Sequence, residues 1–199
     1  MNDNLKIIVL MGIKHCGKTT LGKRLASYFN GLFFDTDDVI FQQTGKTARE
    51  IYSESGASAF MEAEKVACES VVKQLSSLNA EGGESKYAIV STGGGFCNNE
   101  GAKEVLKGKS KFVFLKTDEL VAADRIAKEI TVATDGSLSG VPAYIAKEKP
   151  KSVEEVRTIF HDFYEKRCAL YSAMADITVL LPKASKEENT QRLIDAISE

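Results

Sequence analysis

The 199-residue chain lacks the patterns that mark zinc-binding, disulfide-rich and membrane-spanning proteins. Its four cysteines, at positions 16, 68, 97 and 168, show no Cys-x-x-Cys spacing, which argues against a zinc site and a disulfide framework. No apolar run reaches the roughly 18 residues that a membrane span requires. The first residues, Met1-Asn2-Asp3-Asn4, lack the positive region of a signal peptide, so we expect a cytoplasmic protein.

The chain also has no large excess of positive or negative charge. The net charge of −2 gives no reason to expect a nucleic acid or membrane partner. The length and the 43% apolar content suit one α/β domain over residues 1–199. We expect a monomer that acts on a small molecule.

A phosphate-binding pattern stands near the N-terminus. Residues 12–19, Gly-Ile-Lys-His-Cys-Gly-Lys-Thr, match G-x-x-x-x-G-K-[ST] in full. The apolar run at 7–11 predicts a strand before it, and the helical spacing of Leu21, Leu25 and Phe29 predicts a helix after it. Strand, glycine loop and helix form the setting that the motif needs, and a chance match in a turn is a poor alternative. The sequence therefore predicts nucleoside triphosphate binding.

The chemistry of this loop follows from its backbone and two side chains. Glycines let successive N–H groups turn towards phosphate oxygens, and the helix adds the positive end of its dipole. Lys18 is placed to reach the β- and γ-phosphates, and the Thr19 hydroxyl to ligate Mg²⁺. Cys16 has two readings, a thiol of lowered pKa or a small tolerated loop residue, and the second is favoured. The predicted phosphate-binding residues are Gly12, Cys16, Gly17, Lys18, Thr19 and Thr20.

The rest of the pattern predicts an α/β fold, a parallel sheet with helices on both faces. Strands are expected at 6–11, 32–35, 87–91, 111–116 and 177–181. Helices are expected at 18–29, 36–43, 46–54, 57–77, 99–107, 117–128, 152–174 and 187–198. Residues 81–85 read as a surface loop. The segment 134–150 has two glycines, two prolines and no sustained periodicity, which is typical of an active-site lid.

Two further motifs follow expected strands. Asp35-Thr36-Asp37 ends the second strand, where alternation would put both carboxylates on one side, or where one of these residues would cap the next helix. One carboxylate would hold Mg²⁺ and the other a substrate hydroxyl. Gly93, Gly94 and Gly95 follow the third strand. Three consecutive glycines favour close approach of the backbone to a ligand, because a simple turn does not need them.

The ordered set of motifs resembles the shikimate kinase family, of the P-loop kinase type with a mobile lid. The resemblance rests on the phosphate loop, Asp35-Thr36-Asp37, the triple glycine, and the segments Phe60-Met61-Glu62-Ala63-Glu64 and Arg167-Cys168-Ala169-Leu170-Tyr171. It runs nearly end to end. It implies transfer of the γ-phosphoryl group of ATP to a hydroxyl of shikimate, in aromatic amino acid biosynthesis.

The resemblance also implies roles for individual residues. Lys18 and Asp37 would be catalytic, with Asp37 on the acceptor hydroxyl and Asp35 beside Mg²⁺. Gly93, Gly94 and Gly95 would touch the acceptor. Arg167 would grip the acceptor's carboxylate, although an arginine on a long helix is more often a solvated surface residue. Arg125 would pack on adenine, and a lid spanning about 128–150 would close over ATP.

Two arginines of the family pattern are absent. Met61 stands where the family has an arginine that binds the shikimate carboxylate, and Ala57 replaces the acidic residue that supports it. Val141 stands where the lid has an arginine that stabilises the transferring phosphoryl group. Lys128, Lys147 or Lys149 would be substitutes in the lid, and Lys65 would be one near the acceptor. Met61 equally fits an apolar helix face.

These departures leave four functions to compare. The first is a shikimate kinase-like enzyme, and the second is a kinase of the same fold for a different small hydroxylated acceptor. The third is a nucleotide-binding protein with little turnover, which the triple glycine and the Asp pair disfavour. The last is a nucleotide kinase, which the lack of an arginine-rich acceptor region disfavours.

Overall fold

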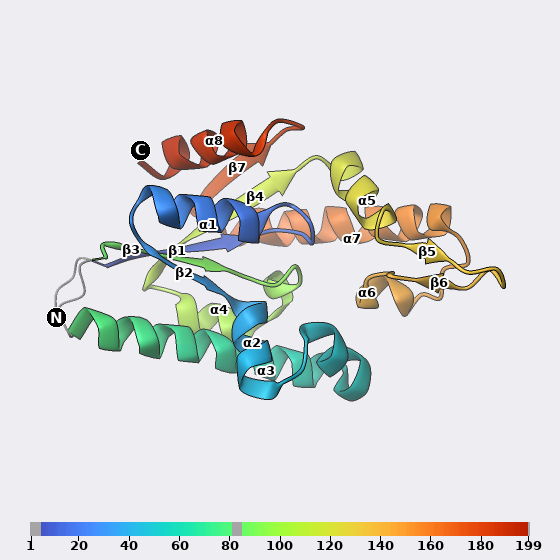
Figure 1. Ribbon diagram of the computed structural model, residues 1–199, viewed down its shortest axis with the longest axis horizontal. Helices are drawn as coiled ribbons and strands as arrows, with labels where there is room; N and C mark the ends of the chain where they lie inside the picture. Colours follow the sequence, from blue (N-terminus) through green and yellow to red (C-terminus); the bar gives the residue numbers. More distant parts are fainter. Residues whose placement is uncertain (1–4, 81–84, 199) are drawn as a thin grey trace.

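The centre of the molecule is a five-stranded parallel sheet (Figure 1). The computed structural model describes residues 5–80 and 85–198. The strands are β1 (Lys6–Met11), β2 (Leu32–Asp35), β3 (Tyr87–Ser91), β4 (Ser110–Thr117) and β7 (Ile177–Leu181). Their order is β2-β3-β1-β4-β7, and every neighbouring pair is parallel. The predicted sheet is confirmed, with each strand within a residue of its expected bounds.

The middle strands are buried on both faces, as their apolar sequences require. Val9 and Leu10 of β1, Val90 of β3 and Val113 of β4 are completely buried. A parallel sheet needs such continuous apolar strands because helices cover both of its faces. The register pairs Val9 with Val90 on one side and with Phe112 on the other. This register brings the carboxyl ends of β1, β2 and β3 together at one edge.

Helices cover the two faces of the sheet (Figure 1). The helices α1 (Lys18–Tyr28) and α8 (Lys186–Ser198) pack together on one face. On the other, α3 (Ala48–Ala80) packs against α4 (Glu100–Leu106). The helix expected at 99–107 is confirmed as α4, which begins where the Asn99 side chain accepts from the Ala102 N–H. A short 3₁₀ turn, η1 (Phe96–Asn98), precedes it.

A glycine divides α3 into two parts. Gly56 has φ 82° and ψ −177°, a conformation that is essentially restricted to glycine. The two helices expected at 46–54 and 57–77 are therefore two parts of α3 on either side of Gly56. The short helix α2 (Thr36–Thr44) packs against α3 and begins directly after β2. The surface loop expected at 81–85 lies almost entirely outside the described residues.

The segment after α5 (Glu119–Ala127) contains regular structure that the sequence did not indicate. The strands β5 (Thr131–Val132) and β6 (Leu138–Ser139) form an antiparallel hairpin, and α6 (Ala143–Ala146) follows. The turn has Gly136 at φ 82°, and the Ala133 N–H donates to the Ser137 carbonyl at 2.9 Å. Two-residue strands are too short for a periodic pattern, so the expectation of an irregular segment was wrong. The chain then enters α7 (Val153–Met174).

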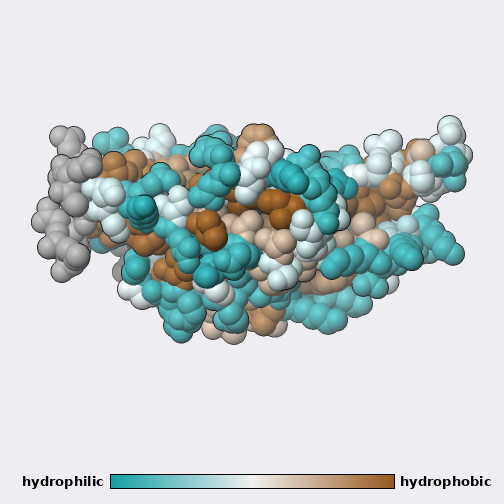
Figure 2. Space-filling view, turned by 90° about the horizontal axis from the view of Figure 1, so that it is seen from below, coloured by the Kyte–Doolittle hydropathy of each residue, from teal (hydrophilic) through white to brown (hydrophobic). Residues whose placement is uncertain are grey.

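The face seen in Figure 2 carries apolar side chains in separate patches between hydrophilic ones. Among the helices of the described residues, none is long and apolar enough to cross a membrane.

Candidate active site

Two adjoining cavities lie at the carboxyl ends of the strands. The loop cavity, about 680 Å³, is lined by residues 14–21 together with Asp35, Thr92 and Arg125. The α3 cavity, about 750 Å³, is lined by α3, by residues 93–95 and by Arg167. In open parallel sheets, this edge is where ligands bind.

The phosphate loop takes a conformation that requires its glycines. Gly12 has φ 152° and Gly17 has φ 102°. A Cβ atom at position 12 would lie 2.8 Å from the Leu115 carbonyl oxygen, so no side chain fits there. Gly17 is the N-cap of α1, which directs the helix N-terminus at the loop cavity. The loop therefore offers backbone N–H groups and a helix dipole to an anion.

Lys18 is buried beneath this loop. Its exposed fraction is 8%, and its Nζ donates to the carbonyl oxygens of Gly12 and Ile13, both at 2.9 Å. These bonds fix the ammonium group at the floor of the loop cavity. The Cys16 thiol is 2% exposed and accepts a longer contact from the same ammonium, at 3.7 Å. Cys16 is thus a packed residue of the loop.

Asp35 connects the second strand to the phosphate loop. Its Oδ2 accepts from the Thr19 hydroxyl at 2.7 Å, and its Oδ1 accepts from the Asp37 N–H at 3.1 Å. Asp35 is both the last residue of β2 and the N-cap of α2. The strand ends there, so of the two alternatives the helix cap is confirmed and alignment of Asp35 with Asp37 along a strand is wrong. Asp37 reaches the site from the first turn of α2 instead.

Asp37 lies where the two cavities meet, because it lines both of them. Desolvation between the cavity walls raises the pKa of its carboxyl group, and the nearby Asp35 carboxylate raises the pKa further. A raised pKa makes this carboxylate a better proton acceptor than an ordinary aspartate.

The first two residues of the triple glycine approach their neighbours too closely for side chains. A Cβ atom at Gly93 would lie 2.8 Å from Glu64 Oε1, and one at Gly94 would lie 2.8 Å from the Lys14 backbone nitrogen. Gly95 has Arg167 Nη2 4.0 Å from its Cβ position. The glycines therefore bring the α3 cavity wall, the phosphate loop and Arg167 together.

Glu64 is a fully buried carboxyl group beside this glycine run. Its Oε2 accepts from Asn99 Nδ2 at 2.9 Å, while Oε1 has no hydrogen-bond partner in the described part of the chain. Burial raises the pKa of Glu64 to about 7, and the Asp37 carboxylate adds to the rise while the Asn99 hydrogen bond opposes it. Glu64 belongs to the segment 60–64 on which the family resemblance rests, but the sequence did not indicate its burial.

Arg167 is held by aromatic rings. Its guanidinium carbon lies 4.0 Å from the centroid of the Tyr144 ring and 5.5 Å from that of Phe163. Its exposed fraction is 9%, so the alternative of a solvated surface arginine was wrong. Arg167 also lines the α3 cavity, and the contacts of its guanidinium with the rings are cation–π contacts.

Arg125 lines the loop cavity beside the phosphate loop. Its Nη1 donates to the His15 carbonyl oxygen at 2.5 Å. His15 has φ 65° and is partly buried, with Nε2 3.2 Å from Glu129 Oε2. The guanidinium is therefore held against the backbone of the phosphate loop.

The positions of the two absent arginines are apolar in the structure. Met61 and Ala57 line the α3 cavity, and Val141 is buried with an exposed fraction of 4%. Lys65 lies outside the cavity lining and faces Glu62 and Glu69, each at 3.7 Å, so its expected approach to the acceptor was wrong.

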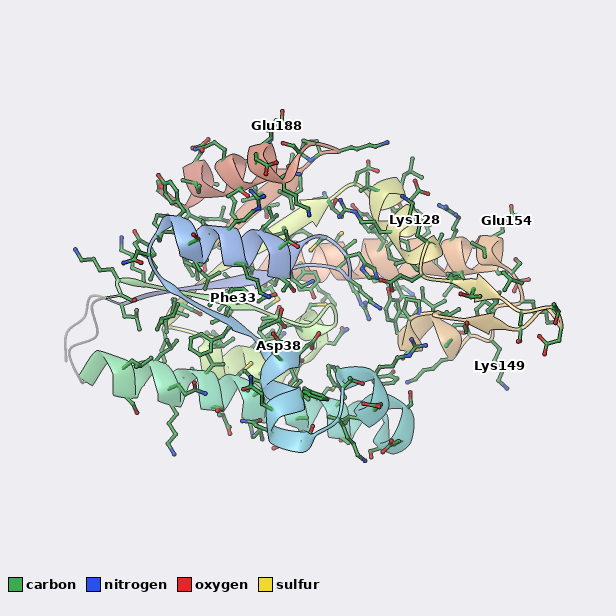
Figure 3. All side chains as sticks on the ribbon, viewed as in Figure 1. Phe33, Asp38, Lys128, Lys149, Glu154 and Glu188 are labelled. Carbon is green, nitrogen blue, oxygen red and sulfur yellow. The ribbon has the colours of Figure 1, made fainter. Side chains whose placement is uncertain are left out.

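The three lid lysines differ in position. Lys128 lines the loop cavity. The Lys147 ammonium lies 4.5 Å from the centroid of the Tyr52 ring. Figure 3 places Lys149 at the outer side of the hairpin and α6, with its side chain directed away from the sheet. Lys128 is therefore the only one of the three that lines either cavity.

Two cationic residues of the site were missed at the sequence level. Arg49, in the first turn of α3, lines the α3 cavity and donates through Nη2 to the Val141 carbonyl oxygen at 3.1 Å. Lys14 lines both cavities. No motif signals Arg49, because its partner lies 92 residues away. Lys14 lies inside the phosphate loop, whose predicted side-chain chemistry rested on Lys18 and Thr19.

Protein oxygen atoms suitable for a divalent cation are few. In residues 5–80 and 85–198, no three His, Cys, Asp or Glu side chains gather to hold a metal ion. The Thr19 hydroxyl and the Asp35 carboxylate, 2.7 Å apart beside the phosphate loop, are two hard oxygen groups. This donor set fits Mg²⁺, which keeps waters and takes phosphate oxygens besides one or two protein ligands.

Comparison with known proteins identifies the family. A model of the shikimate kinase family matches residues 14–198. This chain belongs to the shikimate kinase family. Its members are phosphotransferases that act on an alcohol acceptor. The resemblance drawn from the motifs is confirmed.

Individual members of the shikimate kinase family are distant in sequence. The shikimate kinase of Dictyoglomus turgidum is 26% identical over 197 residues, which cover 99% of this chain and 98% of that protein. The shikimate kinase of Corynebacterium glutamicum is 35% identical over 105 residues, so the aligned part spans about half the length of that relative (55%) and 53% of this chain.

Solved structures agree with the fold. The shikimate kinase from Bacteroides thetaiotaomicron is 25% identical, with a TM-score of 0.73 over 98% of this chain and 99% of that one. The shikimate kinase from Acinetobacter baumannii in complex with shikimate is 24% identical, with a TM-score of 0.73 over 98% of this chain and 94% of that one. The P-loop kinase fold of this chain is thereby established.

Proposed function

We propose that this chain transfers the γ-phosphoryl group of ATP to a hydroxyl group of shikimate. The observation that carries the proposal is the position of Asp37, which opens onto both the loop cavity and the α3 cavity. A kinase needs a proton acceptor at the junction of its nucleotide and acceptor sites, and family membership supplies the substrate class.

The loop cavity binds the nucleotide. The backbone of residues 12–19 takes the phosphates, Lys18 neutralises the β- and γ-phosphates, and Thr20 lies in the same lining. Thr19 and Asp35 hold Mg²⁺, directly or through water, and Mg²⁺ supplies charge neutralisation when it is bound. Arg125 packs on adenine, and residues 128–150 form the lid.

The α3 cavity binds the acceptor. Gly93, Gly94 and Gly95 bring backbone groups to it, and Arg167 grips its carboxylate with a guanidinium whose orientation the Tyr144 and Phe163 rings fix. Asp37 orients the acceptor hydroxyl and takes its proton, which the raised pKa of the Asp37 carboxyl favours.

The decisive experiment measures ADP release from ATP·Mg²⁺ with shikimate and with a panel of other hydroxy acids and polyols. We expect turnover with shikimate. Asp37→Asn should lower kcat by about 10²-fold or more, the usual contribution of a general base, while the KM for ATP changes little. A raised KM for ATP with kcat intact would assign Asp37 to the nucleotide instead.

A second candidate is a kinase for a hydroxylated acceptor that has no carboxylate group facing Met61 in the α3 cavity. The apolar lining at Met61 and Ala57 favours it. Turnover of a panel compound with a kcat/KM well above that of shikimate would establish this second function and reject the first.

A substitution at Met61 separates the two candidates. If shikimate is the acceptor, Met61→Arg adds a charge-assisted hydrogen bond worth about 1.5–3 kcal/mol and should lower the KM for shikimate by about tenfold or more. Met61→Leu is the matched control and should leave that KM unchanged. If the KM for shikimate rises or stays constant in Met61→Arg, the acceptor's carboxylate does not bind beside position 61.

A further inference from the structure

Three of the described residues line both cavities: Lys14, Asp37 and Gly94. They mark the passage through which a phosphoryl group moves from the loop cavity to the α3 cavity. Asp37 supplies a carboxylate there, and Gly94 has no side chain. Lys14 is the one cation of the three.

Position 141 of the lid provides no cation at this passage. The Val141 side chain is packed into the core, and its carbonyl oxygen is taken by Arg49. Lys128 lines the loop cavity alone, and Arg49 and Arg167 line the α3 cavity alone. No arginine of the lid is therefore placed to neutralise the negative charge on the phosphoryl group during transfer.

The structure fixes the backbone of Lys14 and leaves its side chain movable. Its backbone nitrogen lies against Gly94, at the 2.8 Å approach that excludes a Cβ atom there. Its side chain is 41% exposed, and Nζ lies 3.5 Å from Glu129 Oε2 at the base of the β5–β6 hairpin. Lys18, in contrast, is bonded to two loop carbonyls beneath the phosphate loop. A flexible four-carbon stem lets the Lys14 ammonium follow the transferring group.

We propose that Lys14 is a catalytic residue that stabilises the phosphoryl group during transfer, in place of a lid arginine. The inference rests on the proposed function. In the step, the acceptor oxygen forms a bond to the γ-phosphorus while the bond from that phosphorus to the β,γ-bridging oxygen breaks. The electron pair leaves on ADP, and the acceptor proton passes to Asp37. Lys14 faces the equatorial oxygens, where negative charge is spread in the transition state.

Kinetics of four proteins separate this role from a structural ion pair. Lys14→Ala should lower kcat by about 10²-fold or more, the usual loss for one transition-state donor, with both KM values within about threefold. Lys14→Arg should recover most of that loss. Glu129→Gln removes the same ion pair but keeps the ammonium, so kcat should fall by less than about fivefold. Lys107→Ala, which removes an exposed lysine paired with Glu104, is the matched control.

Calorimetry gives a second readout that needs no turnover. Tetrafluoroaluminate with ADP·Mg²⁺ mimics the transferring phosphoryl group. Wild type should bind ADP·Mg²⁺ more tightly with this ion than without it. In Lys14→Ala this gain in affinity should be smaller by a factor of at least about ten. The affinity of Lys14→Ala for ADP·Mg²⁺ alone should stay within about threefold of the wild-type value.

The outcomes distinguish this inference from the proposed function. An unchanged kcat and an unchanged tetrafluoroaluminate gain in Lys14→Ala would overturn the role of Lys14 and leave shikimate phosphorylation intact. If kcat falls as much in Glu129→Gln as in Lys14→Ala, the ion pair between the two residues has a structural role. That result would also overturn the catalytic role of Lys14. If wild type does not turn over shikimate, the proposed acceptor fails, and the calorimetric gain decides the role of Lys14.

Discussion

Glu64 has a carboxyl group that water does not reach, and only one of its two oxygens has a hydrogen-bond partner in the described chain. An uncompensated buried carboxylate is costly, which is why the pKa of Glu64 rises to about 7. The folded protein therefore retains a proton at pH 6 that the unfolded chain, with a glutamate pKa near 4.5, has released.

This difference predicts how stability depends on pH. Since the folded state binds the extra proton, the Glu64 contribution to the free energy of unfolding falls as pH rises from about 4.5 to about 7. The fall is on the order of 3 kcal/mol at most, from 1.36 kcal/mol per pKa unit. Glu64→Gln keeps the shape of the side chain but does not titrate. Its free energy of unfolding, measured by chemical denaturation at several pH values, should therefore depend less on pH over this range than that of the wild type.

Glu62→Gln is the matched control, because Glu62 is an exposed glutamate of the same helix. It should keep the wild-type pH dependence. A Glu64→Gln protein with the wild-type slope would mean that Glu64 titrates in the folded state as it does in the unfolded chain.

At the scale of elements, the segment of β5, β6 and α6 is fastened to the acceptor side of the site. Arg49 of α3 bonds the Val141 carbonyl, and Arg167 of α7 stacks on Tyr144 of α6. Both arginines also line the α3 cavity. Through Arg49 and Arg167, the position of this segment should respond to the occupant of the α3 cavity.

Arg49→Ala tests this coupling. Loss of one charged hydrogen-bonding group should raise the KM for the acceptor by about tenfold, from a charged hydrogen bond of about 1.5–3 kcal/mol, while the KM for ATP changes less. Steady-state kinetics with each substrate varied in turn measure the two effects. Arg24→Ala, which removes an exposed arginine paired with Glu187, should change neither. A larger rise in the KM for ATP would place the coupling on the nucleotide side.

At the scale of the whole molecule, nucleotide binding should stabilise the fold, because the loop cavity is formed only in the folded chain. ATP·Mg²⁺ at about 100 times its Kd adds about 2.7 kcal/mol, which for a chain of this size raises Tm by roughly 5–10 °C. Lys18→Ala should lose most of this shift, since the proposed function places Lys18 at the β- and γ-phosphates. Each protein is compared with its own nucleotide-free Tm in calorimetric scans.

Lys107→Ala serves again as the control and should keep the full shift. An equal Tm shift in Lys18→Ala and wild type would place the phosphates elsewhere.

The sequence predicted most of the fold and the position of part of the candidate site, for reasons that particular residues show. The apolar run at 7–11 and the glycines of the phosphate loop act through local backbone preferences, so the pattern alone indicated their structure. Gly56 separates the two parts of α3 for the same reason. The β5–β6 hairpin was missed because two-residue strands are stabilised by their partner and carry no periodic signal.

What the sequence determined by itself is the phosphate loop, the five strands of the parallel sheet with the helices between them, and the family to which the chain belongs. Neighbouring residues, their spacing and their backbone preferences are sufficient for these. Only the tertiary structure decided that Lys14 and Asp37 stand between two cavities, that Arg49 reaches Val141, and that Glu64 loses its water. Burial and cavity lining depend on segments that are distant in the chain, and the desolvation that shifts a pKa exists only once those segments have packed.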